Sequence, residues 1–290
     1  SIPELDTGKG TDFSQMFSSC DSLTIIPQLD VSNGIDFSYM FNDCYKLTSI
    51  PELDTSKGTN FTYMFDSCRA LTSVSKLDVN SGENFSYMFN GCTNLTSIPE
   101  LNASNGTDFS YMFYKCGALT SASKLNISKN NGTNFRYMFY NCNNLTSIPE
   151  LDTSNGTNFE SMFDGCTNLV SVPRLNVGNG TKFTYIFNNC ESLQELYLYN
   201  IKKSIAIGVE AIYGHLLTVD SLIHIINELH PVTSKTTLTM GSVNINKLNG
   251  LYCKIIDETN SKLPMVLCES TDSGAMLIGD YITGKGWTYR

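Results

Sequence analysis

Eight cysteines are the first residues in this chain whose type and spacing could do chemistry. Successive members lie 24 residues apart, except for one gap of 26, at Cys20, Cys44, Cys68, Cys92, Cys116, Cys142, Cys166 and Cys190. Zinc sites need closely spaced thiolates or histidines, and the repeated region has no C-x-x-C and no histidine. Copies stacked about 5 Å apart would direct their Cβ atoms the same way, which suits disulfides poorly. We therefore expect buried thiols that react slowly.

A column of charged side chains recurs with the same period. Its members lie just before the last leucine of each repeat: Glu4, Gln28, Glu52, Lys76, Glu100, Lys124, Glu150 and Arg174. From Glu52 onward the sign alternates, and opposite charges on neighbouring strands stabilise their pairing slightly. We favour a role in holding the register of an exposed strand face, with a ligand-binding face as the alternative.

Acidic and amide side chains form another column, two positions further on: Asp6, Asp30, Asp54, Asp78, Asn102, Asn126, Asp152 and Asn176. The phrase Asp54-Thr-Ser-Lys-Gly58 resembles part of a calcium loop, but the bidentate acid that would complete such a loop is missing. We interpret these residues as Asx turns, in which the side chain accepts a hydrogen bond from the backbone. No metal or cofactor is expected.

Six tyrosines provide the most suggestive surface feature. Each comes two residues after a repeated phenylalanine: Tyr39, Tyr63, Tyr87, Tyr111, Tyr137 and Tyr185. On a helix that offset is about 200°, so they should point away from the core as a stripe. Tyrosine is enriched at interfaces and stacks on sugars. Packing of neighbouring tyrosines on one another as scaffold is the simpler interpretation, and a binding surface is the alternative.

Catalytic patterns find no support. The sequence holds no G-x-S-x-G, P-loop or H-E-x-x-H pattern, and its three histidines (His215, His224 and His230) lie in the C-terminal region. We therefore expect a protein that is not an enzyme.

The element that positions all these columns is a repeat of the form F-x-x-M-F-x-x-C-x-x-L-x-x-I-P-x-L. Phe85, Met88, Phe89 and Cys92 lie at i, i+3, i+4 and i+7, which predicts a short helix capped by Asn84. Residues 95–101 predict a short extended segment paired in parallel with its copies, with the recurrent proline at a bulge or at the end of the ladder. Residues 102–107 predict a turn in which glycine supplies a positive φ. A fixed period in the twenties indicates a solenoid.

This repeat resembles the BspA-like leucine-rich repeats of bacterial surface proteins, over roughly residues 1–195. The resemblance implies an α/β fold, a right-handed β/α solenoid of eight turns. It also implies a secreted or surface-attached adhesin that binds host proteins, and it supplies no catalytic residues.

Residues 196–290 lack the repeat and predict a small mixed α/β cap for the last turn. Residues 193–198 read as a last repeat-like strand, 202–207 as one further strand, and 218–229 as a helix with Thr218 as N-cap. Residues 236–240 and the segment around Trp287 are interpreted as cap elements. Residues 251–256 and 263–268 predict a hairpin inserted in the cap, and a disulfide between Cys253 and Cys268 is left open.

Charge and hydropathy narrow the classes of partner. The net charge is −9 and the pI about 4.8, which argues against binding to nucleic acid or anionic lipid. No apolar run is long enough to span a bilayer. Ser1-Ile-Pro-Glu-Leu5 lies in mid-repeat, so we expect a fragment of a longer protein that carries a signal peptide. The preferred hypothesis is a secreted or surface binding module for a host or cell-surface protein or polysaccharide. The alternative is a structural spacer, such as one associated with a phage tail or virion.

Overall fold

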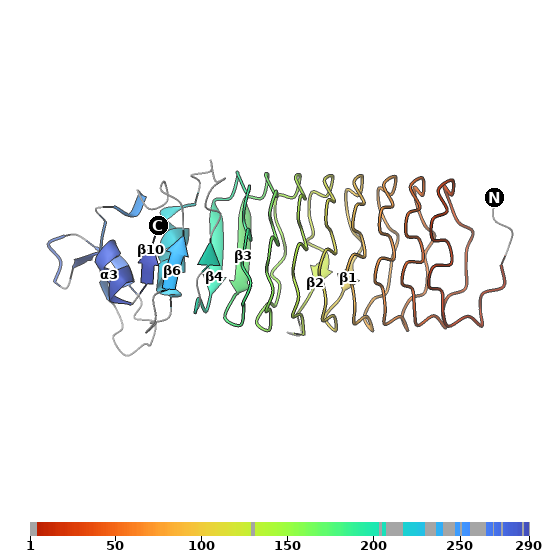
Figure 1. Cartoon of the computed structure of the whole chain (residues 1–290), viewed down its shortest axis with the longest axis horizontal. Coiled ribbons are helices and arrows are strands. Elements are labelled where there is room, and N and C mark those ends of the chain that lie inside the picture. The colour runs from red at the N-terminus through yellow and green to blue at the C-terminus, as the bar shows by residue number, and fades with distance from the viewer. Residues whose placement is uncertain are drawn as a thin grey trace.

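The chain forms an elongated stack of similar turns, with the N-terminus at one end and the C-terminal elements at the other (Figure 1). The computed structural model describes residues 5–128, 131–202, 205–206, 217–229, 236–239, 247–249, 251–255, 265–268, 270–273, 275–285 and 287–289. Equivalent residues of neighbouring turns are 24 positions apart in most turns, as in the parallel bridge between Asn60 and Asn84. Each turn buries its apolar face against its neighbours, so the core runs the length of the solenoid.

The segment from the first phenylalanine to the cysteine is not a helix, and this prediction was wrong. The amides of Phe61, Tyr63, Phe65 and Ser67 donate to carbonyl oxygens of the next turn at 2.7–3.0 Å. The amides between them close i→i−3 turns, such as Met64 to Phe61 at 3.2 Å. A two-turn helix is marginal alone, whereas this arrangement gives half of the amides a partner in the neighbouring turn. The apolar spacing is the same in both arrangements.

This backbone requires two left-handed residues in each turn. Tyr63 has φ 57° and Ser67 has φ 59°, and the equivalent pairs recur along the solenoid. A non-glycine residue in this conformation costs roughly 1–3 kcal/mol unless its surroundings impose it. Here the hydrogen bonds to the next turn impose it, because both amides donate across the interface between turns.

The repeated glycines have a different role from the predicted one. The structure gives positive φ among the described glycines only at Gly91 and Gly165, and neither belongs to the repeated turn position. At Gly106 an added Cβ would lie 2.5 Å from Cζ of Phe109 and 2.8 Å from the ring of Phe85. Glycine is therefore required by the close approach of the phenylalanine rings and not by a left-handed turn.

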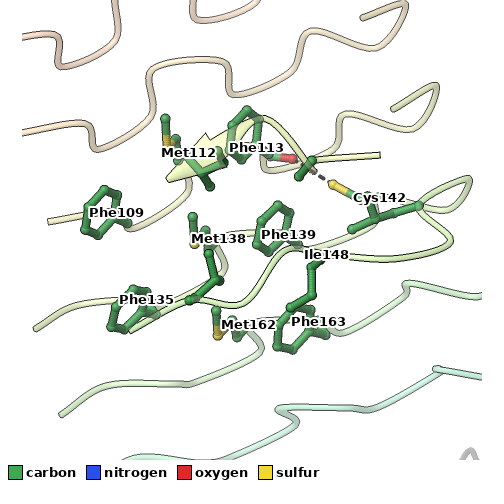
Figure 2. Packing of buried hydrophobic residues seen from close by; sticks show 14 of the residues in the cluster. Phe109, Met112, Phe113, Phe135, Met138, Phe139, Cys142, Ile148, Met162 and Phe163 are labelled. Atoms are coloured by element: carbon green, nitrogen blue, oxygen red, sulfur yellow. Dashed lines mark hydrogen bonds between the residues drawn. The ribbon is translucent and has the colours of Figure 1, made fainter. Parts of the chain in front are cut away.

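Two columns of phenylalanine rings fill the core (Figure 2). Phe85 and Phe109 have ring centroids 5.7 Å apart with planes 4° apart, and Phe89 and Phe113 repeat this at 5.6 Å. Methionines such as Met112 and Met138 are fully buried beside them. Aromatic pairs of this kind contribute about 0.5–1.5 kcal/mol beyond the burial of their area.

The cysteines from Cys44 to Cys190 are buried free thiols, as predicted. Each donates to the carbonyl of a phenylalanine in the preceding turn; Figure 2 shows the bond from Sγ of Cys142 to the oxygen of Phe113, at 3.0 Å. Burial raises the pKa of Cys44 to about 11 and that of Cys92 well above its usual range. These thiols stay protonated near neutral pH, so they are poor nucleophiles.

The opposite side of each turn carries short parallel pairing, as predicted. Strands β1 (Leu101–Asn102) and β2 (Leu125–Asn126) pair with each other, and β3 (Ser171–Asn176) pairs with β4 (Glu195–Tyr199). The register shifts between Val172 and Arg174, which places a bulge at Pro173. The predicted bulge at the proline is confirmed in this copy, and it follows from the missing amide hydrogen of proline.

Helix α1 (Val219–Asn227) continues the stack after the last repeated turn. It is capped by Thr218, whose side chain accepts from the amide of Ser221. The amide of Thr218 donates to the oxygen of Gln194, 24 residues earlier, at 2.9 Å, which continues the spacing of the solenoid. The helix buries its own Leu222, Ile225 and Ile226.

The other elements form two small sheets. Strands β5 (Ile205–Ala206), β6 (Thr236–Thr239) and β10 (Trp287–Tyr289) are parallel in the order β10-β6-β5. Strands β7 (Tyr252–Ile255) and β8 (Met265–Cys268) form the predicted hairpin, β9 (Met276–Leu277) flanks β7, and helix α3 (Ile278–Gly284) follows.

The hairpin register bears on the disulfide that the sequence left open. Cys253 lies opposite Leu267 and Cys268 opposite Tyr252, so the two cysteines do not face each other in the ladder. The side chain of Cys268 lies outside the described residues, as do Glu4, His215 and His230.

Candidate binding surface

Five of the six predicted tyrosines form one continuous column of stacked rings. Successive centroids from Tyr39 through Tyr63, Tyr87 and Tyr111 to Tyr137 are 4.3–4.9 Å apart, with planes 7–18° apart. Their left-handed backbone, and not a helical offset, turns these side chains outward to half-exposed positions. Tyr185 lies outside this column because Ser161 occupies the intervening turn, and its side chain is 60% exposed.

Stacking decides which part of each tyrosine is available. The faces of the inner rings cover one another, so the column offers ring edges and hydroxyls to solvent. Partial burial raises the pKa of Tyr111 to about 12. A sugar ring stacks on an open aromatic face. The middle of the column therefore lacks the platform that the sequence argument invoked for glycans.

A second pair of rings joins the column at its C-terminal end. Tyr114 and Tyr140 stack at 4.8 Å, and Tyr114 lies 5.3 Å from Tyr111 while Tyr140 lies 5.3 Å from Tyr137. Five of the six other turns carry aspartate or asparagine at this position. Side-chain hydrogen bonds join some of these residues between turns, as where Nδ2 of Asn188 donates to Oδ1 of Asp164 at 2.9 Å. The sequence departs from its repeat here and places four tyrosines together.

Two cations complete what we call the aromatic–cationic cluster: Tyr111, Tyr114, Lys115, Arg136, Tyr137 and Tyr140. The guanidinium of Arg136 lies 4.8 Å from the ring centroid of Tyr137 and 5.8 Å from that of Tyr111. Its Nε is 3.2 Å from Oε2 of Glu160. The ammonium of Lys115 lies 5.1 Å from the ring of Tyr114. These contacts hold both cations over aromatic rings at the surface.

Sequence reasoning found Tyr111 and Tyr137 but missed Tyr114, Arg136 and Tyr140. The missed residues occupy positions that are short and polar in the other turns, where serine or threonine commonly aligns with Arg136 and asparagine or aspartate with Tyr114. Aligning the turns and asking where they differ would have located them, because a repeat that is otherwise uniform makes such departures visible.

The charged column is less organised than its alternation suggested. Among the described residues, Lys76 and Glu52 form the one ion pair along it, at 3.8 Å, and their side chains are 79% and 66% exposed. Glu100, Lys124 and Glu150 have no ion-pair partner among the described residues, and Arg174 lies over the ring of Tyr199 at 4.9 Å. Exposed pairs of this kind contribute well under about 1 kcal/mol.

Open grooves run beside this charged column. One of about 740 Å³ is lined by Gln28, Glu52, Lys76 and neighbouring Asp54, and another of about 530 Å³ lies between Glu150 and Arg174.

The aspartates that line the grooves accept hydrogen bonds from nearby backbone amides. The side chain of Asp54 accepts from the amide and hydroxyl of Ser56 at 3.2 and 2.7 Å, which confirms the predicted Asx turn. Asp36 and Asn84, which lie just before the repeated phenylalanines, each accept a hydrogen bond from the backbone amide two residues later. Within the described part of the chain, no group of three or more His, Cys, Asp or Glu residues could hold a metal ion.

A known protein family matches the repeated part of the chain. The model of the family described as Mycoplasma protein of unknown function, DUF285, matches residues 1–97, 46–150 and 124–211. The chain belongs to this family. The three matches overlap on the repeated turns and extend just past the last of them. No curated protein matches the chain.

Two solved structures show looser similarity. A leucine-rich-repeat protein of T. pallidum is 21% identical over 58% of this chain and 76% of that one, with a TM-score of 0.42. A complex of TLR13 with ssRNA13 is 11% identical over 81% of this chain and 44% of that one, with a TM-score of 0.23.

Proposed function

We propose that the chain is a non-enzymatic binding module of a secreted or cell-surface protein, and that the aromatic–cationic cluster binds a protein partner. The observation that carries the proposal is the concentration of Tyr114, Arg136 and Tyr140 in two adjacent turns of an otherwise uniform repeat. Tyrosine and arginine dominate the energetics of protein interfaces. The resemblance of the repeat to BspA-like surface proteins supports the same direction.

A host or cell-surface protein fits this cluster better than a polysaccharide. The faces of Tyr111 and Tyr137 are covered by each other and by Arg136, so edges, hydroxyls and cations remain for a ligand. Edges and hydroxyls suit the polar and apolar mixture of a protein surface. Nucleic acid is not favoured, because the chain has a net charge of −9. No helix in the described part of the chain could cross a membrane.

A structural spacer is the second candidate. It is favoured by the straight stack of near-identical turns in Figure 1 and by phenylalanine columns that continue without interruption from Phe13 to Phe183. A spacer requires the core columns but gives no reason for the aromatic–cationic cluster.

The test compares the chain with a variant that restores the repeat at the cluster. Arg136→Ser, Tyr114→Asn and Tyr140→Asn introduce residues found in other turns, so the solenoid should fold unchanged. Both proteins, with Tyr185→Ala as a matched control outside the cluster, are probed on arrays of host-matrix proteins and glycans. We expect protein ligands that bind the parent and Tyr185→Ala but not the restored variant. Blank protein arrays would favour the spacer, and ligands that are glycans would overturn the protein partner.

A further inference from the structure

The tyrosine column has a geometry that predisposes neighbouring rings to couple covalently. Tyr63 and Tyr87 have centroids 4.3 Å apart with planes 8° apart, and Tyr87 and Tyr111 follow at 4.4 Å and 7°. The phenylalanine columns are wider, at 5.3–5.7 Å, and fully buried in the middle of the solenoid. The tyrosines are half-exposed, so a small oxidant in solvent can reach them.

We propose that this column is a site of oxidative tyrosine cross-linking, in which dityrosine bonds join adjacent turns of the solenoid. When two tyrosines each lose one electron and the hydroxyl proton, unpaired spin spreads onto the ortho carbons of the rings. The orbitals that carry this spin stand perpendicular to the ring plane. In a parallel stack they point at the neighbouring ring, so face-to-face rings are aligned for bond formation.

The chemistry balances with peroxide as the terminal oxidant. The ortho carbon of one ring bonds to the ortho carbon of the other, and each displaced ortho hydrogen moves as a proton to the oxygen of its own ring. The pair loses two electrons and two protons in total. One hydrogen peroxide, acting through a haem peroxidase, takes them up and becomes two waters.

Two described tyrosines outside the column, Tyr45 and Tyr185, lack a stacked tyrosine neighbour and are expected to stay uncoupled. Tyr185 has Ser161 in the preceding turn and therefore no ring to couple with along the column. Tyr45 faces the guanidinium of Arg69 at 5.0 Å and donates its hydroxyl to Asp43. Tyr114 and Tyr140 form a separate stacked pair, at 4.8 Å, which serves as an internal positive control.

Each bond would tie two turns that are otherwise held by hydrogen bonds and packing. The tie closes a loop of 24 residues between Tyr63 and Tyr87, which limits the unfolded chain as a disulfide does. The coupled chain should therefore resist unfolding more than the parent. This inference does not depend on the proposed partner, because it follows from the stacking of the tyrosine column, which shares only Tyr111 and Tyr137 with the cluster.

The experiment oxidises the purified chain by brief illumination with a ruthenium photo-oxidant and persulfate, then maps cross-linked peptides in the monomer fraction. We expect Tyr63–Tyr87 and Tyr87–Tyr111 linkages, each lighter by two hydrogens, in a chain whose size is unchanged. The double variant Tyr63→Phe, Tyr111→Phe keeps the stack but leaves no adjacent tyrosines around position 87. It should lose both linkages and retain Tyr114–Tyr140.

The matched control Tyr45→Phe, Tyr185→Phe removes two tyrosines outside the column and should cross-link like the parent. Two results would overturn the proposal. One is an absence of linkages within the column while Tyr114–Tyr140 forms. The other is a linkage pattern in the folded chain that is the same as in urea, where proximity along the column is lost.

Discussion

Gly106→Ala tests the packing that positions every surface column. The added Cβ would lie 2.5 Å from Cζ of Phe109 and 2.8 Å from two ring atoms of Phe85, whereas ordinary contact begins at 3.4 Å. Both rings are fully buried and belong to the same stack. Neither can move away without opening a gap against its next neighbour.

The expected cost follows from overpacking of a well-filled core, about 1–3 kcal/mol. The matched control is Gly117→Ala, where the nearest atom to the new Cβ is Oδ1 of Asn143 at 3.8 Å. With no steric cost, that variant should gain roughly 0.4–1 kcal/mol because alanine restricts the unfolded chain. In thermal unfolding followed by circular dichroism, Gly106→Ala should therefore melt several degrees below the parent, at about 2–4 °C for each kcal/mol lost. The melting temperature of Gly117→Ala should be equal to that of the parent or higher.

A second substitution identifies the ring as the cause. Phe109→Leu removes the Cζ atom that the new methyl would meet, so the double variant should be more stable than the sum of the two single changes predicts. Two results would contradict this account: a melting temperature of Gly106→Ala equal to that of Gly117→Ala, or no energetic coupling between Gly106→Ala and Phe109→Leu. Either would mean that the close approach of glycine and phenylalanine does not shape the turn.

Three further predictions follow from electrostatics and burial. Burial raises the pKa of Asp66 to about 6, so the folded state holds the proton more tightly than the unfolded one. Stability should therefore fall as pH rises from about 4 to 6, by roughly 1 kcal/mol after allowance for partial exposure, and Asp66→Asn should abolish this slope in urea melts; an unchanged slope would contradict the assignment. Cys20, which is half-buried, should react with a thiol reagent under native conditions well before buried Cys92, as mass mapping of labelled peptides can check; equal rates would refute the burial argument. Lys76→Glu should lower stability by less than about 1 kcal/mol at low salt and not at high salt, because it replaces the 3.8 Å pair with Glu52 by repulsion; an effect that persists in high salt would point to another cause.

The repeat period, the parallel pairing and the buried thiols could all be predicted because a recurring apolar pattern specifies which residues face the core. The pattern could not distinguish the predicted helix at residues 85–92 from the turns that are observed there. Both arrangements bury Phe85, Met88, Phe89 and Cys92. The distinguishing signal was the residue before each cysteine. It is short and polar or glycine in seven of the eight turns, as expected for a left-handed backbone.

The tyrosine stripe was predicted for the wrong reason. A left-handed residue and not a helical offset directs Tyr63 and its equivalents outward. That the rings would stack face to face depends on the separation between turns, which no local pattern contains. The cluster around Arg136 required a comparison between turns, because only departures from the repeat reveal it.

Amide hydrogen exchange with a protein ligand from the array tests the central claim most directly. Exchange is compared for the chain alone and in the complex, peptide by peptide. The aromatic–cationic cluster predicts slower exchange in residues 111–115 and 136–141, and little change around Glu52 and Lys76 on the charged column. Protection confined to the charged column, or an unchanged cluster in a saturated complex, would contradict the assignment of the binding surface.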